Sequence, residues 1–334
     1  MNKSRIAAVT AFLPEERRSA AQTEARLLES NPGLHLPTGL ITRMTGVESV
    51  YVRPADWQAS DLAVAAARQA LEASPGEVDL LIFASASQDL IEPATSHIVN
   101  HKLGLEAPVF DVKNACNSVI NAMQVGSALI EAGVHRRILI ASGEGPTSAV
   151  RWKVRDKEQF LRSFPGYVMG DGGAAVLLEA AEPGSEAGIL ASSFVSVSRH
   201  WTVGTLPGGG TMGKQDPESL YFDMDGAGLQ RAFLELGPGP VEELLTREGL
   251  TTEDFDLVAI HQVALPHVAP VLARLGVASE KVVVTVADHG NLASVTLPLQ
   301  LQLAKERGMI GPGSLILLIG LAGGISLGLM IVRL

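Results

Sequence analysis

The chain has 334 residues, of which 46% are hydrophobic and 19% charged, and this composition is typical of a globular protein with a sizeable core. A net charge of -10 without a run of Lys and Arg argues against a nucleic-acid surface, because neutralising phosphates requires a basic patch. A single cysteine excludes an intramolecular disulfide framework and argues against a structural zinc site, so we expect a cytoplasmic protein.

The first half of the chain alternates helical and strand-like segments. An amphipathic helix is predicted from Asp61 to Ala73, with Ala63, Val64 and Ala67 on its apolar face. Short apolar runs predict the strands that follow, and helical stretches separate them. In chain order these segments are a strand from residue 79, a helix after Pro93, a strand at 109–112, a helix at 117–132, and strands from residues 137 and 173.

The second half repeats that order. Its opening helical stretch, residues 229–247, contains Gly-Pro-Gly-Pro, which should divide it into two helices. The spacing agrees between the halves: Asp79 to Cys116 spans 37 residues and Asp256 to Asn291 spans 35, so we predict equivalent strand-to-helix turns in a duplicated fold. The predicted segments are a strand at 256–261, a helix at 266–275, a strand at 281–286, a helix at 294–307, and strands at 314–319 and 325–332.

The strands are almost entirely apolar, which predicts sheets covered by helices on both faces and therefore an α/β fold. Ligands of such folds gather at the carboxyl ends of the strands. We predict an N-terminal half, residues 1–185, and a C-terminal half, residues 186–334.

The uncharged stretch from Gly308 to Val332 is long enough to cross a bilayer as a helix. Its seven glycines and Pro312 instead favour two buried strands joined by a turn at Gly323-Gly324. A membrane helix is the weaker alternative.

Cys116 lies where an apolar strand gives way to a helix, in Asp-Val-Lys-Asn-Ala-Cys-Asn-Ser. A thiol at a helix N-terminus meets unpaired N–H groups and the positive end of the helix dipole, and both favour the thiolate. This position predicts a nucleophile. The alternative is a small buried hydrophobic residue, which is the usual role of a lone cysteine among Val, Ile and Ala.

The second half offers two partners for this thiol at the ends of predicted strands, His261 and Asn291. Thiol chemistry on an acyl thioester needs an acid or base and hydrogen-bond donors for the developing oxyanion. Taken singly, each residue has a purely structural alternative. The histidine can be a buried core residue with its hydrogen bonds satisfied, and the Gly-Asn pair can be a turn. Together with Cys116 in the repeat, they predict one site.

Motifs along most of the chain resemble those of the thiolase superfamily, and within it the β-ketoacyl-ACP synthase III-like condensing enzymes. They include Asp-Val-Lys-Asn-Ala-Cys, Gly-Asp-Gly-Gly-Ala-Ala-Val from Gly170, Ile-His-Gln from Ile260, Lys-Val-Val-Val-Thr from Lys281, His-Gly-Asn from His289, and the C-terminal Gly-Gly turn followed by Leu-Met-Ile-Val-Arg-Leu.

The resemblance implies a homodimer of the thiolase fold, in which two βαβαβαββ halves form a five-layered αβαβα sandwich. It implies that Cys116 is acylated, that His261 and Asn291 hydrogen-bond the thioester oxygen of a second acyl group as an enolate forms, and that the N–H groups of Cys116 and Gly324 form the oxyanion hole. The substrates would be acyl-CoA or acyl-ACP thioesters, and neither a metal nor another cofactor is expected.

Glu92, in Ser-Gln-Asp-Leu-Ile-Glu-Pro, bears on the branch of the family. This stretch is similar to that of the OleA-type acyl-CoA condensing thiolases, in which such a glutamate crosses the dimer interface and acts as a base. A malonyl donor forms its carbanion by losing CO2, whereas a donor without that carboxylate needs a base to remove an α-proton. We therefore expect Claisen condensation of two acyl thioesters. The alternative for Glu92 is a solvated loop carboxylate.

Departures from the synthase III pattern stand at Leu40, near the usual position of a tryptophan that stacks on the CoA adenine, and at Pro266, where an arginine usually serves carrier docking. The link from Gly145 to Gly170 is shorter than in the olefin enzymes, which puts their long acyl chains in doubt. Three alternatives stay open: decarboxylative condensation with a malonyl thioester, acyl transfer to a hydroxyl or amine, and a catalytically silent acyl-binding subunit.

Three further patterns are weaker. A glycine-rich run from Gly208 resembles a phosphate loop, but Gln215 stands where Ser or Thr would hold Mg²⁺. His261, His267 and His289 fall on different elements, which argues against a metal site. The cluster of Arg151, Lys153, Arg155 and Lys157 is interleaved with acidic residues, so a solvated face is expected, and a contact with a CoA phosphate or a carrier is the alternative.

Overall fold

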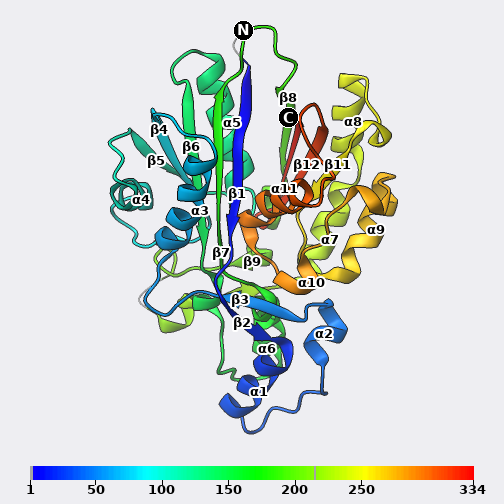
Figure 1. The fold of residues 1–334 in the computed structure, drawn as a ribbon. Coiled ribbons are helices and arrows are strands. Elements are labelled where there is room, and N and C mark those ends of the chain that lie inside the picture. The colour runs from blue at the N-terminus through cyan, green and yellow to red at the C-terminus, as the bar shows by residue number, and fades with distance from the viewer. Residues whose placement is uncertain (1–2, 214–215) are drawn as a thin grey trace.

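The computed structural model describes residues 3–213 and 216–334, so Gln215, the residue that argued against a phosphate loop, lies outside the described residues. Two β-sheets organise the chain (Figure 1). The first sheet is mixed. β7 pairs antiparallel with β1 and β6, whereas β4 pairs parallel with β6 and β5. In spatial order its strands are β1 (Ser4–Phe12), β7 (Gly172–Ala180), β6 (Arg137–Glu144), β4 (Leu80–Ala84) and β5 (Val109–Val112).

The second sheet contains only strands from the C-terminal part of the chain. A parallel pair, β11·β12, is extended by two antiparallel pairings. The division proposed after residue 185 would place each sheet in one half. In spatial order the strands are β11 (Leu257–Ile260), β12 (Leu315–Ala322), β13 (Ser326–Arg333) and β8 (Gly188–Ser196).

β12 and β13 are the two strands predicted within the uncharged C-terminal stretch, and Gly323-Gly324 lies in the turn between them. Both strands are buried along almost their whole length. Within residues 3–213 and 216–334, no helix is both long and apolar enough to cross a membrane.

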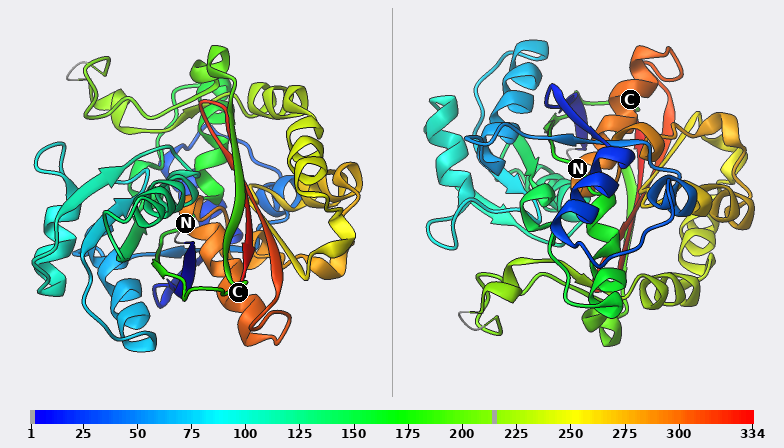
Figure 2. Two further views of the ribbon diagram at one scale, coloured as in Figure 1. Left: turned by 90° about the horizontal axis from the view of Figure 1, so that it is seen from above. Right: turned by 90° about the horizontal axis from the view of Figure 1, so that it is seen from below.

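Helices and sheets alternate in five layers (Figures 1 and 2). α5 (Ser118–Glu131) and α11 (Thr296–Glu306) pack between the two sheets. α3 (Ala59–Ala73) and α4 (Thr95–Leu103) cover the outer face of the first sheet, and α8 (Gly239–Glu248) and α9 (Leu265–Leu275) cover that of the second. The chain therefore has the thiolase-type αβαβα sandwich that the sequence predicts.

The alternation of side chains along β4 explains why this strand is apolar throughout. Ile82 packs toward the central helices, whereas Leu81 and Phe83 pack toward α3 and α4, and all three are almost completely buried. Burying each such side chain stabilises the fold by about 1.5–3 kcal/mol. A strand with helices on both faces has no solvated side, so it shows no polar alternation.

Smaller elements close one end of the sandwich or cover the space between the halves. The predicted break in the stretch 229–247 is confirmed, since α7 ends before Gly-Pro-Gly-Pro and α8 starts within it. These elements are β2 (Glu16–Ser19), α1 (Ala20–Ser30), α2 (Leu40–Thr45), β3 (Ser49–Val52), α6 (Lys157–Ser163), β9 (Gly204–Thr205), β10 (Asp223–Met224), α7 (Gly226–Leu236), α10 (Val286–His289) and the 3-10 helices Pro146–Ala149, Phe164–Val168, Ser198–Val203, Pro217–Leu220, Thr252–Asp254, Ser279–Lys281 and Ala293–Val295.

One predicted strand is wrong. Residues 282–285, all of which the structure describes, form no strand. The side chain of Gln262 takes the place of a neighbouring strand: its amide donates to the carbonyl of Val283 at 2.8 Å and accepts from the N–H groups of Thr285 and Val286 at 2.9 and 3.2 Å. The backbone is thus satisfied by a buried side chain rather than by a ladder.

The residue that matches Cys116 in the second half is not the one that the sequence spacing suggests. α5 begins at Ser118 and α11 at Thr296, and each follows a non-glycine residue with a left-handed backbone three positions earlier, Ala115 and Ala293. The residue in the place of Cys116 is therefore Ser294, not Asn291, because Asn291 lies three residues earlier in the second turn.

Candidate active site

A cavity of about 1310 Å³ is lined by residues of both halves, and α7 forms part of its wall. Cys116, His261 and Asn291 all line it, and so does Gly324. Most of its remaining wall is apolar, with Phe222, Met224, Leu229, Val241 and Leu327 among the contributing side chains. A large apolar space with a few convergent polar groups is the usual form of a small-molecule site.

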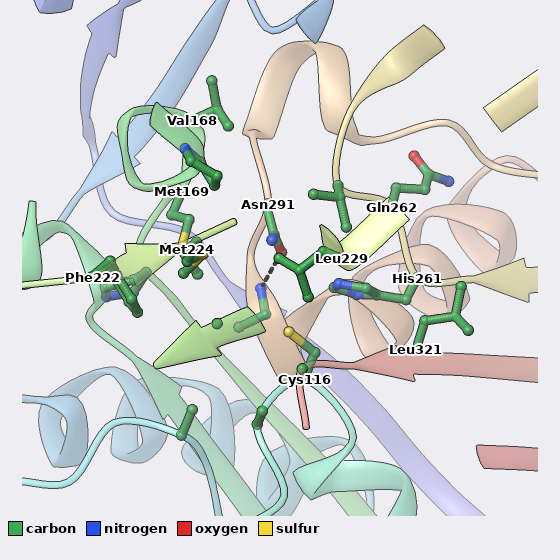
Figure 3. A pocket seen from close by; sticks show the side chains of 18 of the residues that line it. Cys116, Val168, Met169, Phe222, Met224, Leu229, His261, Gln262, Asn291 and Leu321 are labelled. Atoms are coloured by element: carbon green, nitrogen blue, oxygen red, sulfur yellow. Dashed lines mark hydrogen bonds between the residues drawn. The ribbon is translucent and has the colours of Figure 1, made fainter. Parts of the chain in front are cut away.

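Cys116 lies in the turn between β5 and α5. The preceding Ala115 has a φ angle of 46°, a left-handed conformation uncommon for a residue with a Cβ. The turn is fastened from the other half of the fold, because the buried Asn117 donates to the carbonyl and the hydroxyl oxygen of Ser326 at 3.1 and 3.0 Å. The thiol of Cys116 points into the cavity (Figure 3).

The thiol itself is less acidic than the sequence predicts. Burial raises the pKa of Cys116 to about 12, and the neighbouring carboxyl group of Glu144 adds to the rise. A backbone hydrogen bond at Cys116 lowers the pKa but does not offset these two effects, so the expected preference for thiolate is wrong for the resting pocket. Desolvation disfavours the charged form more than a terminal dipole favours it.

His261 follows β11 and is held by backbone pairing on both sides. Its N–H donates to the carbonyl of Ile319 at 2.9 Å, and the side-chain amide of Gln300 pairs with both backbone groups of Ile260 at 3.1 and 2.7 Å. Burial lowers the pKa of His261 to about 4, so its imidazole is neutral at neutral pH. Among the described residues its Nδ1 has no hydrogen-bond partner, although it is fully buried.

Asn291 is fixed by its own turn. Its N–H donates to the carbonyl of Val168 at 2.9 Å, and its Oδ1 accepts from the N–H of Ala293 at 2.9 Å, the bond drawn in Figure 3. Within the part of the chain that the structure describes, its NH2 group donates to no protein acceptor. The side chains of Cys116, His261 and Asn291 point toward one another (Figure 3).

Two backbone N–H groups complete the polar end of the cavity. Gly324 lies in the β12–β13 turn with a φ angle of 110°, a conformation that favours glycine. Neither its N–H nor that of Cys116 donates to a backbone carbonyl in the described ranges. Both residues line the cavity beside the thiol, where free donors can hold an oxyanion.

Glu92 is not brought to Cys116 within one chain. It is exposed, at the tip of the loop between β4 and α4, and does not line the cavity, whereas its neighbours Leu90 and Ile91 do. Those two side chains are 51% and 69% exposed, which is unusual for large apolar groups. A Cβ on Gly209 would lie 3.3 Å from Ile91, so the glycine-rich loop packs against this tip.

The comparisons with known proteins identify the family. The family description 3-oxoacyl-[acyl-carrier-protein] synthase III matches residues 110–197, and the description of its C-terminal region matches residues 245–334. A β-ketoacyl-[acyl-carrier-protein] synthase III from Neisseria meningitidis is 29% identical over 338 aligned positions, which cover 100% of both chains. The chain belongs to the 3-oxoacyl-ACP synthase III family of the thiolase superfamily.

Solved structures with the same fold include both branches considered above. An OleA variant from Xanthomonas campestris is 25% identical with a TM-score of 0.88, covering 99% of this chain and 97% of its own. FabH from Pseudomonas aeruginosa PAO1 is 25% identical with a TM-score of 0.85, covering 99% and 98%. A second OleA structure, with lauric acid and lauroyl-CoA bound, is 24% identical with a TM-score of 0.90, covering 99% of each chain. This synthase III-family protein is an acyltransferase that condenses thioesters.

The sequence analysis missed Glu144, the last residue of β6. This residue lines the cavity, yet only 1% of its surface is exposed to solvent. Burial raises the pKa of its carboxyl group. It accepts hydrogen bonds from the N–H of Ala86 and the hydroxyl of Ser87, both at 3.0 Å, and from Ser294 at 2.5 Å. A carboxylate at the carboxyl end of a mostly apolar strand was the available signal.

The other residues singled out in the sequence have mixed positions in this synthase III fold. Pro266 and His267 line the cavity, whereas Leu40 packs against a separate apolar cluster. The ring of His289 packs at a tilt against that of Tyr51. Arg151 pairs with Glu218 and lies over Tyr221, and Arg155 pairs with Asp156, so these cations already have protein partners. Among the described residues, no three His, Cys, Asp or Glu side chains form a metal-binding group.

Proposed function

We propose that this enzyme joins two acyl-CoA molecules by Claisen condensation through an acyl group on Cys116. The observation that carries the proposal is the convergence of Cys116, His261 and Asn291, from both halves of the fold, at the polar end of one large apolar cavity. Their roles follow the chemistry that each side chain can perform.

In the first step, Sγ of Cys116 attacks the thioester carbonyl of the first acyl-CoA. The N–H groups of Cys116 and Gly324 hold the oxyanion, and the CoA thiolate leaves as the C–S bond to CoA breaks. Because burial keeps the Cys116 pKa at about 12, the thiol gives up its proton as the new bond forms. The neutral imidazole of His261 takes that proton and returns it to the departing thiolate.

In the second step, the acceptor thioester loses an α-proton to Glu92 of the partner subunit. His261 and the NH2 group of Asn291 donate hydrogen bonds to the enolate oxygen, and the α-carbon attacks the acyl group on Cys116. The C–S bond to Cys116 breaks, which gives a β-keto thioester and restores the thiol after proton uptake. A neutral His261 can donate to that oxygen from one ring nitrogen.

Support for a base that acts across a homodimer comes from the exposed loop. Glu92 is exposed and does not line its own cavity, and Leu90 and Ile91, which precede it, are exposed apolar side chains. β5 is the edge strand of the first sheet, and its Phe110 is 36% exposed. An unprotected edge with apolar neighbours is a surface that a second subunit could cover.

Acyl-CoA is the donor that we propose because the OleA neighbour binds lauroyl-CoA in a fold that matches over nearly the whole chain. The apolar wall of the cavity suits an alkyl chain rather than a polar group. The net charge of -10 means that phosphates or an acidic carrier must meet a local basic patch.

Supplying acyl-CoA alone is the test. We expect intact-mass detection of an acyl adduct on the wild type, none on Cys116→Ala, and a β-keto product without any malonyl donor. Glu92→Gln should still form the adduct but condense at least 100-fold more slowly. Glu182→Gln, at an exposed glutamate that does not line the cavity, is the matched control and should behave as wild type.

A second candidate is decarboxylative condensation with a malonyl thioester. The 29% identity to a β-ketoacyl-ACP synthase III over the full chain favours it, and it uses the same Cys116, His261 and Asn291. Strict dependence on malonyl thioester with CO2 release would replace the first proposal by this one. An adduct that is passed only to a hydroxyl or amine would indicate acyl transfer, and no adduct with any thioester would indicate a silent acyl-binding subunit.

A further inference from the structure

We propose that Glu144 is a positioning residue for the condensation step. It fixes the turn of Asn291 at its own cavity and the loop whose Glu92 serves the cavity of the partner subunit. The inference deepens the proposed function and rests on it. Glu144 ends β6, the strand next to β4, and so lies between the segments that carry these two groups.

Toward the loop of Glu92, the carboxyl group makes two hydrogen bonds. Oε1 accepts from the N–H of Ala86 and Oε2 from the hydroxyl of Ser87, both at 3.0 Å. Ser87 Oγ also accepts from the N–H of Gly145 at 3.0 Å, so the loop is attached to the end of β6 at two adjacent residues. Five residues later the same loop reaches Glu92.

Farther along, this loop has a second attachment. The carboxylate of Asp89 accepts from the N–H of Ser60 at 3.0 Å, and the N–H of Asp89 donates to Thr95 Oγ1 at 3.2 Å. The segment from residue 85 to 89 is therefore held at both ends, and the exposed tip with Glu92 projects from it. A shift at Ala86 and Ser87 would move the point from which that tip projects.

Toward the turn of Asn291, the carboxyl group accepts from Ser294 Oγ at 2.5 Å. Ser294 is buried, and its hydroxyl oxygen lies 3.0 Å from that of Ser142 on β6. The residue before it, Ala293, donates its N–H to Oδ1 of Asn291 at 2.9 Å. One bonded path thus leads from Glu144 through Ser294 to the amide that binds the acceptor thioester.

The position calls for two acceptor oxygens. Three donors converge on Glu144, two on Oε1 and one on Oε2. A glutamine keeps one oxygen for Ala86 and Ser294 but presents an NH2 group to Ser87, whose hydroxyl then loses its acceptor. Glu144→Gln therefore perturbs mainly the loop link, and Ser294→Ala removes only the turn link.

Neither link contacts the donors that hold the acyl-Cys116 carbonyl, which are backbone groups of Cys116 and Gly324. Acylation of Cys116 should therefore be largely preserved in the variants, whereas transfer of the acyl group to the enolate should be lost. A residue needed only for folding would affect both half-reactions equally.

The test measures the half-reactions separately on full-length enzyme. Acylation by acyl-CoA is followed by intact mass, and condensation is followed as β-keto product from pre-acylated enzyme and a second acyl-CoA. For Glu144→Gln, Ser87→Ala and Ser294→Ala we expect acylation at no less than one third of the wild-type rate. Condensation should be at least tenfold slower, with the KM for the second acyl-CoA within twofold. Ser87→Ala should add little to Glu144→Gln, because both break the same link.

Ser127→Ala is the matched control, since this buried serine also donates to a glutamate, Glu131 at 2.9 Å, but lies outside the cavity. It should change neither half-reaction. Parallel loss of acylation and condensation, or no loss of either, in the Ser87 and Ser294 variants would overturn the positioning role. An absent adduct on wild type would instead remove the proposed function itself, and this inference with it.

Discussion

Ala115 and Ala293 have nearly the same left-handed backbone conformation, with φ angles of 46° and 48°, in turns from opposite halves of the fold. Each turn leads into a helix of the central layer, and the next residue is Cys116 in one half and Ser294 in the other. Cys116 points into the cavity, whereas Ser294 is buried and donates to Glu144. The two copies of one turn thus hold the proposed nucleophile in one half and, in the other, the serine that donates to Glu144.

The left-handed conformation predicts an unusual tolerance of glycine at residue 115. A residue with a Cβ is destabilised by about 1 kcal/mol in the left-handed conformation, and glycine avoids this cost. This gain offsets the larger conformational entropy that glycine has in the unfolded chain. Ala115→Gly should therefore change the free energy of unfolding by less than about 0.5 kcal/mol. Ala65→Gly, in the middle of α3, should cost about 1 kcal/mol.

Thermal unfolding at one scan rate compares the two variants. Ala115→Val adds a β-branched side chain in the same conformation and should be the least stable of the three. If Ala115→Gly lost as much stability as Ala65→Gly, the conformation of this turn would not be strained.

The high pKa of Cys116 predicts how its thiol reacts with pH. With burial raising the pKa to about 12, the thiolate fraction grows about tenfold for each pH unit from 7 to 10. Alkylation by iodoacetamide should therefore rise log-linearly over that range without a plateau. Because the charge of Glu144 contributes to the raised pKa, Glu144→Gln should react faster than wild type at each pH at which Glu144 is ionised.

Intact mass gives the alkylation rates directly, since the chain has one cysteine. Cys116→Ala supplies the background. A plateau near pH 8 in the wild type would contradict the burial of this thiol and would restore the thiolate expected from the helix N-terminus alone.

His261 predicts a loss of stability in mild acid. Its pKa is about 4 in the folded protein but about 6.5 in an unfolded chain, so the unfolded state binds more protons between these values. Stability should therefore fall as the pH falls from 6.5, by up to about 1.4 kcal/mol per unit and about 3 kcal/mol in all. His261→Gln removes the titrating group.

Chemical unfolding of both proteins at pH 7, 6, 5 and 4.5 isolates this contribution, because all other titrating groups are shared. The stability of His261→Gln should decline less steeply with falling pH. Equal slopes would mean that His261 takes up its proton in the folded state as readily as in the unfolded one.

The order of helices and strands was predictable because apolar periodicity and turn residues are local in sequence. The strand expected at 281–286 failed for a non-local reason: Gln262, a side chain 21 residues from Val283, satisfies that backbone. Apolar periodicity indicates that a segment is buried, but it does not indicate which group forms hydrogen bonds with the backbone of that segment.

The site divides in the same way. Cys116, His261 and Asn291 follow predicted strands in the two halves, and this predicted that they line one site. The repeat did not give the correct match for Cys116, which is Ser294 rather than Asn291. Glu144 and Ser294 could not be predicted as part of the site, because their hydrogen-bond partners lie 58 and 150 residues away in the sequence. A glutamate is ordinarily solvated, and a serine at such a turn is ordinarily a helix cap. The shift of the Cys116 pKa has the same origin, since its burial arises from elements of both halves.

The proposed path of the α-proton predicts complementation between inactive subunits. If Glu92 serves the cavity of the partner subunit, a dimer of one Cys116→Ala chain and one Glu92→Gln chain has one cavity with an intact cysteine and an intact glutamate. That cavity contains Cys116 of the Glu92→Gln chain and Glu92 of the Cys116→Ala chain.

Co-expressing the two variants with different affinity tags and isolating the doubly tagged species should restore about half the condensation rate of wild type, since one of two cavities is complete. Each variant alone should be inactive in condensation. If Glu92 instead served its own chain, neither cavity of the mixed dimer would contain both groups, and the activity would stay at the background of the single variants.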